Sequence, residues 1–289
     1  MSGAESRRIP LATGLEYHVL EWNRGAPHTV LLIHGFLDFG GGWAPMVEAG
    51  DFAERFHVVA PDLRGHGDSD RIGAGGYYHF MDYLADLHSL IEQLASERLS
   101  IVGHSMGGSI AGYYAGTYPA QVHRLALLEG LGPPETPTMV PDRVIGWIEG
   151  WNRARGKPAR SYPDVAAAAA RLQQHDARLD AGLARTLAER GTRPGPGGGV
   201  VFKHDPLHAT MGPYPYRVDV ALEFWRRVTC PVLLVDADQS SFRHARDELE
   251  RRARGFAHCQ QRTLPGAAHM MQRHQPAALA AMLGDFLAS

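Results

Sequence analysis

A serine framed by glycines supplies the clearest chemical signal in this 289-residue sequence. Residues 103–107 (GHSMG) come directly after the apolar run 99–102 and directly before a helical stretch. This context is typical of a nucleophile elbow, a sharp, strained turn whose small residues let strand and helix approach closely. The turn lifts the serine hydroxyl above the sheet and directs the first N–H groups of the helix at a reacting carbonyl. Ser105 is therefore the candidate nucleophile of an acyl-transfer reaction.

The elements around this motif alternate between strands and helices. Continuous apolar runs at residues 29–34 and 57–60 are typical of strands buried on both faces of a sheet, and residues 83–94 have the apolar spacing of an amphipathic helix. Further strands are expected at residues 16–22, 99–102, 125–128, 232–235 and 261–264, and further helices at residues 109–118, 243–254 and 276–287. This alternation predicts an α/β fold with a mostly parallel central sheet flanked by helices.

The alternation stops between residues 133 and 226, where no strong strand pattern is found. Helices are expected there at residues 143–151 and 165–187, followed by a turn at 191–199 (GTRPGPGGG). We therefore expect residues 1–132 and 227–289 to form one α/β core domain, interrupted by a helical insertion over residues 133–226.

Four motifs together resemble the α/β-hydrolase family, in particular its serine hydrolases of the esterase-like branch with a helical cap. Besides GHSMG, they are residues 34–36 (HGF) after a buried strand, residues 62–69 (DLRGHGDS) after the next strand, and residues 265–269 (PGAAH) after the last strand. The second of these is similar to the family's D-x-R-G-x-G-x-S loop. The resemblance implies the α/β-hydrolase fold, and it implies that the insertion is the family's cap.

The resemblance also assigns the base of the reaction. A serine hydroxyl is a weak nucleophile until a base removes its proton. His269, which closes PGAAH, stands where the family keeps its catalytic histidine. His274 and His258 are the alternatives among the sixteen histidines.

The oxyanion of the reaction would be held by two backbone N–H groups. The resemblance places one on Met106, directly after the nucleophile, and the other on Phe36, with Leu37 as the alternative to Phe36. Removing one such donor typically slows a reaction about 10²–10³-fold.

The acid that orients the base departs from the family's usual pattern. The family usually takes it from the loop after the penultimate strand, in a pattern such as PVLLVxGxxD. Here residues 231–240 are PVLLVDADQS, so Ser240 stands where the acid is expected. Asp236 or Asp238 could replace it if the loop is shifted by two residues, and the absence of any acid is a further alternative.

Some members of the family place the acid after the strand that follows the elbow helix. This sequence has LLEGLGP at that point, over residues 127–133. A carboxylate at the end of a buried strand needs a partner, and an imidazolium forming at His269 would supply one. Glu129 is therefore the predicted acid, and its alternative role is to anchor the cap through an arginine.

The substrate is expected to bind between Ser105 and the insertion. The aromatic residues near that space are Phe36, Phe39, Trp43, Trp147, Trp151, Tyr214, Tyr216, Phe224 and Trp225. If some of them face the site, the acyl or leaving group is apolar and of modest size. No lysine- or arginine-rich cluster lies near the motifs to indicate an anionic substrate.

Composition and charge exclude other classes of protein. Apolar residues make up 44% of the chain, ample for a buried core, and a formal net charge of −2 offers no basic face for nucleic acid. The longest apolar run, around residues 30–33, is far too short for a membrane span, and the N-terminus lacks the apolar region of a secretory signal. We expect a cytoplasmic protein with a small-molecule substrate; the sequence leaves its oligomeric state open.

No cofactor or metal is expected. The cysteines Cys230 and Cys259 lack the spacing of a zinc site and are expected to be buried thiols, with a single bridge between them as the alternative. The histidines His204 and His208, with Asp205, match no set of metal ligands strongly.

These features predict a serine hydrolase that cleaves a carboxylic ester, or a lactone or amide, through an acyl-enzyme. A carbon–carbon bond hydrolase on the same fold would keep the serine and is an alternative. Epoxide hydrolases and haloalkane dehalogenases of this fold use an aspartate nucleophile where this chain has Ser105. A catalytically weak, ligand-binding member of the family is the third alternative, because Ser240 replaces the usual acid.

Overall fold

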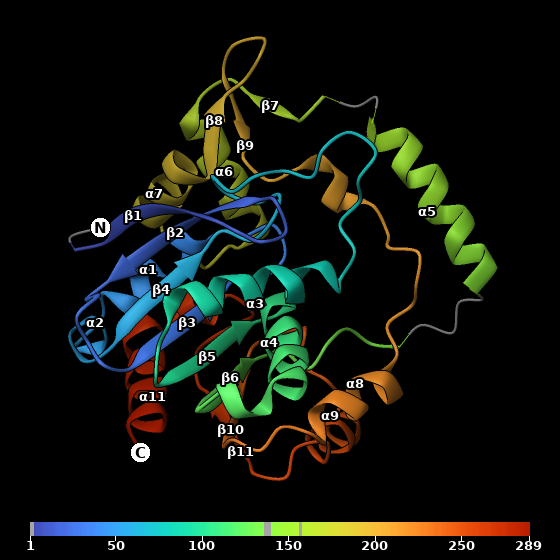
Figure 1. Ribbon diagram of the computed structural model, residues 1–289. Helices are drawn as coiled ribbons and strands as arrows, with labels where there is room; N and C mark the ends of the chain where they lie inside the picture. Colours follow the sequence, from blue (N-terminus) through green and yellow to red (C-terminus); the bar gives the residue numbers. More distant parts are fainter. Residues whose placement is uncertain (1–2, 136–139, 156–157) are drawn as a thin grey trace.

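The computed structural model describes residues 3–135, 140–155 and 158–289. At its centre is an eight-stranded sheet in the order β1-β2-β4-β3-β5-β6-β10-β11 (Figure 1). The strands are β1 (Glu5–Pro10), β2 (Glu16–Trp22), β3 (Thr29–Ile33), β4 (His57–Pro61), β5 (Leu99–His104), β6 (Arg124–Leu128), β10 (Val232–Ala237) and β11 (Cys259–Leu264). The β1–β2 and β2–β4 pairs are antiparallel and the others parallel, which confirms the predicted α/β class with a mostly parallel sheet.

Helices cover both faces of this sheet. One face carries α3 (Asp82–Leu94), α4 (Met106–Thr117), the single turn η2 (Pro119–Gln121), α8 (Val218–Trp225) and α9 (Arg246–Ala253). The other carries η1 (Gly40–Trp43), α1 (Ala44–Val47), α2 (Phe52–Arg55), α10 (Met271–His274) and α11 (Pro276–Ala288). Strand β3 shows why: Leu31 and Ile33 lie in the apolar core under α3 and α4, whereas Val30 and Leu32 lie in the core under α11.

The N-terminal strand β1 has no counterpart among the strands expected from the sequence. Its burial pattern leaves Ile9 as its only buried residue, so no apolar run marks it. It is held at the edge of the sheet by antiparallel pairing with β2. The two thiols, Cys230 and Cys259, are not joined.

The segment between β6 and β10 contains more than helices. It forms α5 (Val140–Arg155), α6 (Val165–His175), α7 (Ala181–Gly191), the short turn η3 (Pro206–Ala209), and a small antiparallel sheet in the order β7 (Ser161–Tyr162), β9 (Val200–Phe202), β8 (Thr192–Pro194). Strands of two or three residues are too short to leave an apolar pattern in a sequence. The expected turn at 191–199 therefore includes β8 and the connection to β9.

The helix expected at residues 165–187 is in fact two helices. Asp180 begins the second of them, because its carboxylate accepts hydrogen bonds from the backbone N–H groups of Gly182 and Leu183. This is the pairing that a helix N-cap makes.

Part of this segment is separate from the main core. Helices α6 and α7 share a small core of alanine and leucine side chains, and α5 has no buried residue. Figure 1 shows α5 set apart from the central sheet. Helix α8, by contrast, packs on the α4 face, where Trp225 is fully buried. We use "outer segment" for the described residues between 140 and 211.

Candidate active site

Ser105 occupies a strained turn at the carboxyl end of β5. Its backbone has φ 53° and ψ −119°, between the last residue of β5 and Met106, the first residue of α4. Such a conformation costs a non-glycine residue about 1–3 kcal/mol and persists only where the surroundings impose it. The Ser105 N–H donates to the carbonyl of Leu128 at 2.9 Å, which ties the turn to the end of β6.

The glycines around Ser105 are required by close backbone contacts. A Cβ on Gly103 would lie 2.6 Å from Cα of Gly108, and a Cβ on Gly107 would lie 2.5 Å from the carbonyl oxygen of His34. The helix can therefore approach the sheet only if these positions lack a side chain, which explains the spacing of the motif.

The structure brings Glu129 and His269 together. His269 Nδ1 lies 2.6 Å from Glu129 Oε2, although 140 residues separate the two in sequence. Glu129 follows directly after β6 with φ 45°, and its side chain is 2% exposed. The loop after β11 supplies His269. Both residues thus lie at the same carboxyl edge of the parallel strands as Ser105.

Ser240, which replaces the usual acid, is a partner of Glu129. Its hydroxyl donates to Glu129 Oε2 at 2.8 Å, and the backbone N–H of Ala237 donates to Oε1 at 3.2 Å. Burial alone would raise the pKa of Glu129, but the hydrogen bonds from His269, Ser240 and Ala237 lower it below its ordinary value. Glu129 is therefore ionised at neutral pH. The sequence analysis did not predict that Ser240 would support it.

The alternative acids do not reach the histidine. Among the described residues, no hydrogen bond joins Asp236 or Asp238 to His269. Burial, together with the nearby charge of Glu129, raises the pKa of Asp236. The backbone of Asp238 is held by β11, its N–H donating to the carbonyl of Leu264 at 3.2 Å.

The alternative bases have other partners. His274 Nε2 lies 2.8 Å from Asp176 Oδ2 in the outer segment, and its Nδ1 accepts from the N–H of Ala268 at 3.1 Å. His258 is exposed just before β11, where its carbonyl accepts from the N–H of Val232. Both ring nitrogens of His274 are thus engaged, and His258 lies before β11, at the edge of the parallel strands opposite to Ser105.

Two aromatic rings hold His269 in place. The ring of Phe242 stacks on it with centroids 4.2 Å apart, and the ring of His104 lies at 4.6 Å. His104 Nε2 donates to the carbonyl of His269 at 2.8 Å, and burial lowers the pKa of His104 well below its ordinary value, which favours the neutral ring. The described residues show no hydrogen bond between Ser105 Oγ and His269; such contacts are often long without substrate.

The backbone next to Ser105 offers unused donors. The N–H groups of Phe36, Leu37 and Met106 have no acceptor among the described residues. The loop that carries the first two approaches the serine, because a Cβ on Gly35 would lie 3.2 Å from Ser105 Cβ. Unpaired N–H groups beside a nucleophile are what an oxyanion hole requires.

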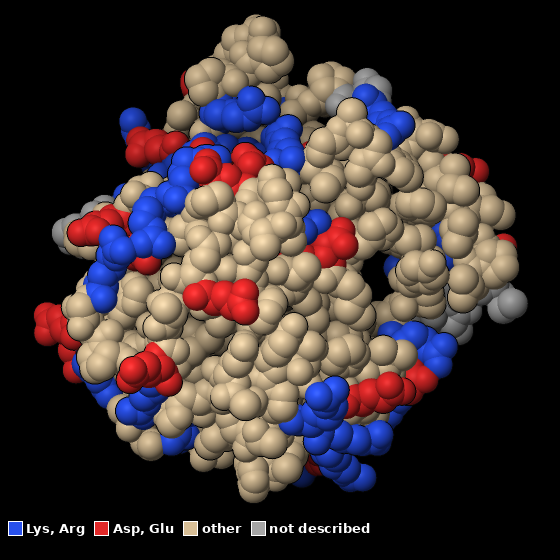
Figure 2. Space-filling view, in the orientation of Figure 1, with Lys and Arg blue, Asp and Glu red and all other residues tan. Residues whose placement is uncertain are grey.

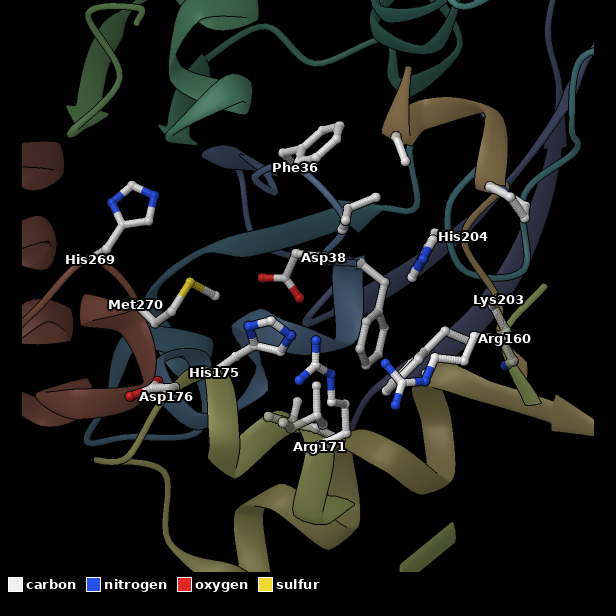
Figure 3. A pocket seen from close by; sticks show the side chains of 18 of the residues that line it. Phe36, Asp38, Arg160, Arg171, His175, Asp176, Lys203, His204, His269 and Met270 are labelled. Carbon is white, nitrogen blue, oxygen red and sulfur yellow. The ribbon is translucent and has the colours of Figure 1, made fainter. Parts of the chain in front are cut away.

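A cavity of about 1020 Å³ extends from His269 to the outer segment (Figure 3). Ser105 is half-buried and lies outside its lining, whereas Phe36 and His269 belong to it. Its aromatic residues are Phe36, Phe39, Tyr162, Phe202 and Phe242. The cavity can therefore hold an apolar group beside the candidate base.

Most of the aromatic residues expected around the substrate lie elsewhere, and only Phe36 and Phe39 of the nine line this cavity. Trp43 and Trp225 are buried in the two cores of the sheet domain, and Tyr214 is exposed to solvent. The remaining four, which also do not line this cavity, are Trp147, Trp151, Tyr216 and Phe224. The other three aromatic lining residues, Tyr162, Phe202 and Phe242, were not predicted. Tyr162 and Phe202 lie on the short strands β7 and β9, which have no sequence pattern, and Phe242 lies in the loop after β10.

The charges of the cavity also differ from the expectation. Its lining includes five cations, from residues 153, 160, 171, 203 and 273, and two carboxylates, from residues 38 and 176. No basic cluster is visible in the sequence because these cations come from separate elements. On the surface of the molecule shown in Figure 2, by contrast, basic and acidic side chains are interspersed.

Three possible metal ligands lie within 4.8 Å of one another: His18, Asp62 and Asp68. The Asp62 carboxylate already accepts from the N–H groups of Gly40 at 2.7 Å and Asp68 at 2.8 Å, and it lies 2.8 Å from His18 Nδ1. These contacts give the group a structural role in shaping the loop after β4. Of the other weak candidates, His204 stacks on Phe202, and His208 stacks on Tyr78 with its Nε2 3.2 Å from the carbonyl oxygen of Arg64.

Comparisons with known proteins agree with this architecture. A sequence profile described as alpha/beta hydrolase fold matches residues 28–272. The chain is 31% identical over 247 residues to a serine hydrolase-like protein of Danio rerio, covering 83% of this chain and 74% of the relative. The chain therefore belongs to the α/β-hydrolase fold family.

Solved structures include two close matches in shape. A thioesterase domain from the curacin biosynthetic pathway has a TM-score of 0.85 at 27% identity, over 98% of this chain and 100% of that domain. The hypothetical protein PA1622 from Pseudomonas aeruginosa PAO1 has a TM-score of 0.85 at 26% identity, over 99% of this chain and 98% of the other. Among the described residues, no helix is both long and apolar enough to cross a membrane.

Proposed function

We propose that the chain is a serine hydrolase that cleaves a carboxylic ester through an acyl-enzyme, with lactones, amides and thioesters as related acyl substrates. The observation that carries the proposal is the 2.6 Å contact between Glu129 Oε2 and His269 Nδ1, at the sheet edge where Ser105 is held in a strained turn. Nucleophile (Ser105), acid (Glu129) and base (His269) thus follow one another in the chain order that this fold uses.

Glu129 determines which nitrogen of His269 can act as the base. With Glu129 ionised, Nδ1 of His269 carries the proton that it donates to Glu129, which leaves Nε2 as the nitrogen that can accept one. Ser240 and the N–H of Ala237 hold the carboxylate in that orientation. The acid also stabilises the imidazolium that forms when Nε2 takes the serine proton.

The reaction then has two halves. Oγ of Ser105 bonds to the acyl carbon while Nε2 of His269 takes its proton, and the N–H groups of Met106 and Phe36 hold the oxyanion. The bond from carbon to the leaving group breaks as His269 returns the proton to that group. In the second half, His269 takes a proton from water, which attacks the acyl-enzyme. The carboxylic acid product is released and the Ser105 hydroxyl is restored.

We also propose that residues 133–226 serve as the cap of this enzyme. The outer segment supplies one wall of the cavity, and its Asp176 meets His274, five residues after the candidate base. Residues 136–139 and 156–157 of the proposed cap lie outside the described part of the chain. Phe36 and Phe242 would contact the apolar part of a bound ester next to His269.

The proposal is tested with 4-nitrophenyl acetate, butyrate and octanoate, and with S-butyryl pantetheine as the thioester. Wild type is compared with Ser105→Ala and with Ser96→Ala, whose serine lies before β5 at the opposite end of that strand. We expect wild-type turnover of at least one substrate, a loss of about 10⁴-fold or more in Ser105→Ala, and no more than a twofold change in Ser96→Ala. Turnover by neither wild type nor control, or full turnover by Ser105→Ala, would contradict the proposal.

A further inference from the structure

Two guanidinium groups reach the cavity from the outer segment. Arg160 directly precedes β7, and Arg171 lies on α6. Figure 3 shows both side chains in the cavity, with His269 on the opposite side of the view from Arg160. The candidate base and Arg160 thus lie at different ends of one space, with Arg171 between them in this view.

The other cations of the cavity are paired with carboxylates. Arg273 is joined to the buried Asp38, and Lys203 Nζ lies 2.6 Å from Asp68 Oδ2. On α5, Arg153 lies 3.4 Å from Glu149 of the same helix. Each of these charges is therefore compensated within the protein.

Arg160 and Arg171 are not compensated in this way. Within residues 3–135, 140–155 and 158–289, neither lies within 4.0 Å of a carboxylate oxygen. Arg171 donates to the neutral side chain of Gln174 at 3.3 Å, and Arg160 lies over the ring of Tyr162 at 5.3 Å from its centroid. Both retain donors for a ligand.

An excess of positive charge at this place is unusual for the molecule. The chain as a whole has a formal net charge of −2, whereas five cations line the cavity and two of them, Arg160 and Arg171, have no carboxylate partner among the described residues. A guanidinium presents a planar fork of N–H groups that matches a carboxylate or a phosphate in two parallel hydrogen bonds. Arg171 is half-buried, whereas Arg160 is exposed to solvent, so partial burial strengthens this attraction relative to open water mainly at Arg171.

We propose that this end of the cavity binds a fixed anion carried by the substrate, a carboxylate or a phosphate, and that Arg160 and Arg171 are the residues that bind it. The inference rests on the proposed ester hydrolysis and names its substrate class. The cleaved bond would lie beside His269 and Phe36, an apolar portion beside the aromatic lining, and the anion at the far end. An apolar substrate without a charge would leave the two guanidinium groups without partners.

The carboxylate arm of the test uses a matched pair of substrates. One is the 4-nitrophenyl monoester of glutaric acid, whose free carboxylate is ionised at neutral pH, and the other is its neutral methyl ester. The phosphate arm compares S-butyryl 4′-phosphopantetheine with S-butyryl pantetheine. Wild type, Arg160→Gln, Arg171→Gln and the double variant are assayed on both pairs. Arg185→Gln is the matched control, since Arg185 is exposed on α7, pairs with Glu189 and does not line the cavity.

Wild type is expected to favour the anionic member of one pair by about 10-fold or more in kcat/KM, and the favoured pair identifies the anion. The double variant is expected to lose about 10- to 100-fold on that anionic substrate, mainly through KM, and to change less than twofold on its neutral partner. Arg185→Gln is expected to match wild type on both. Equal rates on both members of both pairs, or an undiminished preference in the double variant, would overturn the proposal.

A binding measurement separates failure of the anion site from failure of the proposed function. Ser105→Ala, alone and combined with Arg160→Gln and Arg171→Gln, is titrated with glutarate and with inorganic phosphate by calorimetry. Binding that requires the two arginines, without ester hydrolysis by wild type, would keep the anion site and overturn the hydrolase. Ester hydrolysis by wild type, without anion preference or anion binding, would keep the hydrolase and overturn the anion site.

Discussion

The two walls of the cavity are built differently. The wall at the sheet edge, which includes Phe36 and His269, lies next to two residues in strained backbone conformations, Ser105 and Glu129, over strands that are buried on both faces. The outer wall rests on a small core of alanine and leucine, and its helix α5 has no buried residue. Strain of this kind can persist only in the first setting, where packing fixes the backbone.

The contrast assigns different tasks to the walls. Catalytic groups must be held within fractions of an ångström, and the sheet edge provides this through buried hydrogen bonds such as that of Ser240 to Glu129. The outer wall supplies Arg160 and Arg171 on thinly packed elements, which suits recognition of a flexible substrate. Chemistry is expected to depend on the first wall and substrate preference on the second.

The largest effect is expected when the acid is neutralised. Glu129→Gln should lower kcat by about 10⁴-fold, because an amide cannot hold His269 in the required tautomer or stabilise its charged form. Asp236→Asn is the matched control, with less than a threefold loss. Burial, and then Glu129, raises the pKa of Asp236, so its ionised form destabilises the fold above its ordinary pKa, and the variant should be at least as stable as wild type at pH 7.

Steady-state kinetics on one ester, with urea unfolding of the same samples, check both statements. A loss in Asp236→Asn that equals the loss in Glu129→Gln would show that the acid had been assigned to the wrong residue.

A second prediction compares a buried ion pair of the sheet-edge wall with an exposed ion pair on α7 of the outer segment. Asp38 and Arg273 are 5% and 9% exposed, so Arg273→Met should leave a buried carboxylate and cost about 3–5 kcal/mol of the free energy of unfolding. Arg185→Met breaks the exposed pair with Glu189 and should cost less than about 0.5 kcal/mol. Urea denaturation measures both. Equal costs would mean that the two walls do not differ in packing as described.

The strain at Ser105 gives a smaller effect. Ser105→Gly should unfold with a free energy about 1 kcal/mol higher than Ser105→Ala, because glycine adopts positive φ without strain whereas alanine does not. Ser109, with ordinary helical backbone in α4, is the control position, and there alanine should be more stable than glycine. The same order at both positions would contradict strain at the elbow.

The smallest effect is expected from the support of the acid. The hydrogen bond from Ser240 helps to hold the pKa of Glu129 below its ordinary value of 4.5, despite burial. Ionised Glu129 therefore stabilises the fold above pH 4.5, and this stability is lost as the pH falls through the lower pKa of the folded state. Ser240→Ala should raise that folded pKa and move acid unfolding, followed by circular dichroism, to higher pH. Ser241→Ala should leave the midpoint unchanged, and a common midpoint for all three proteins would contradict the role of Ser240.

Much of the sheet-edge wall was predictable because its signals are local. The spacing of glycines around Ser105 follows from backbone contacts within a few residues of the turn, and the position of His269 follows from the motif that carries it. Glu129 was predicted from the resemblance to family members that place the acid after the strand following the elbow helix, and because a carboxylate that ends a buried strand needs a partner. The hydrogen bond from Ser240 to Glu129 was not predicted. Ser240 stands where the family usually has the acid, and the sequence alone does not show what its hydroxyl contacts.

The outer wall was predicted poorly for the opposite reason. Its strands are two or three residues long, and its two alanine-rich helices share a pattern that conceals the N-cap at Asp180. Arg160 and Arg171 are distant in sequence from His269, so only the folded chain shows that they share a cavity with it. Tertiary placement, rather than residue type, decides which cations face a ligand.

The most direct test of the central claim is intact-mass analysis after treatment with a fluorophosphonate probe, which reports an activated serine without knowledge of the substrate. Wild type, Ser105→Ala and Glu129→Gln are treated side by side. The account predicts a single adduct on wild type, none on Ser105→Ala and strongly slowed labelling of Glu129→Gln. No adduct on folded wild type, or an adduct of equal yield on Ser105→Ala, would contradict the assignment of Ser105 as the activated nucleophile.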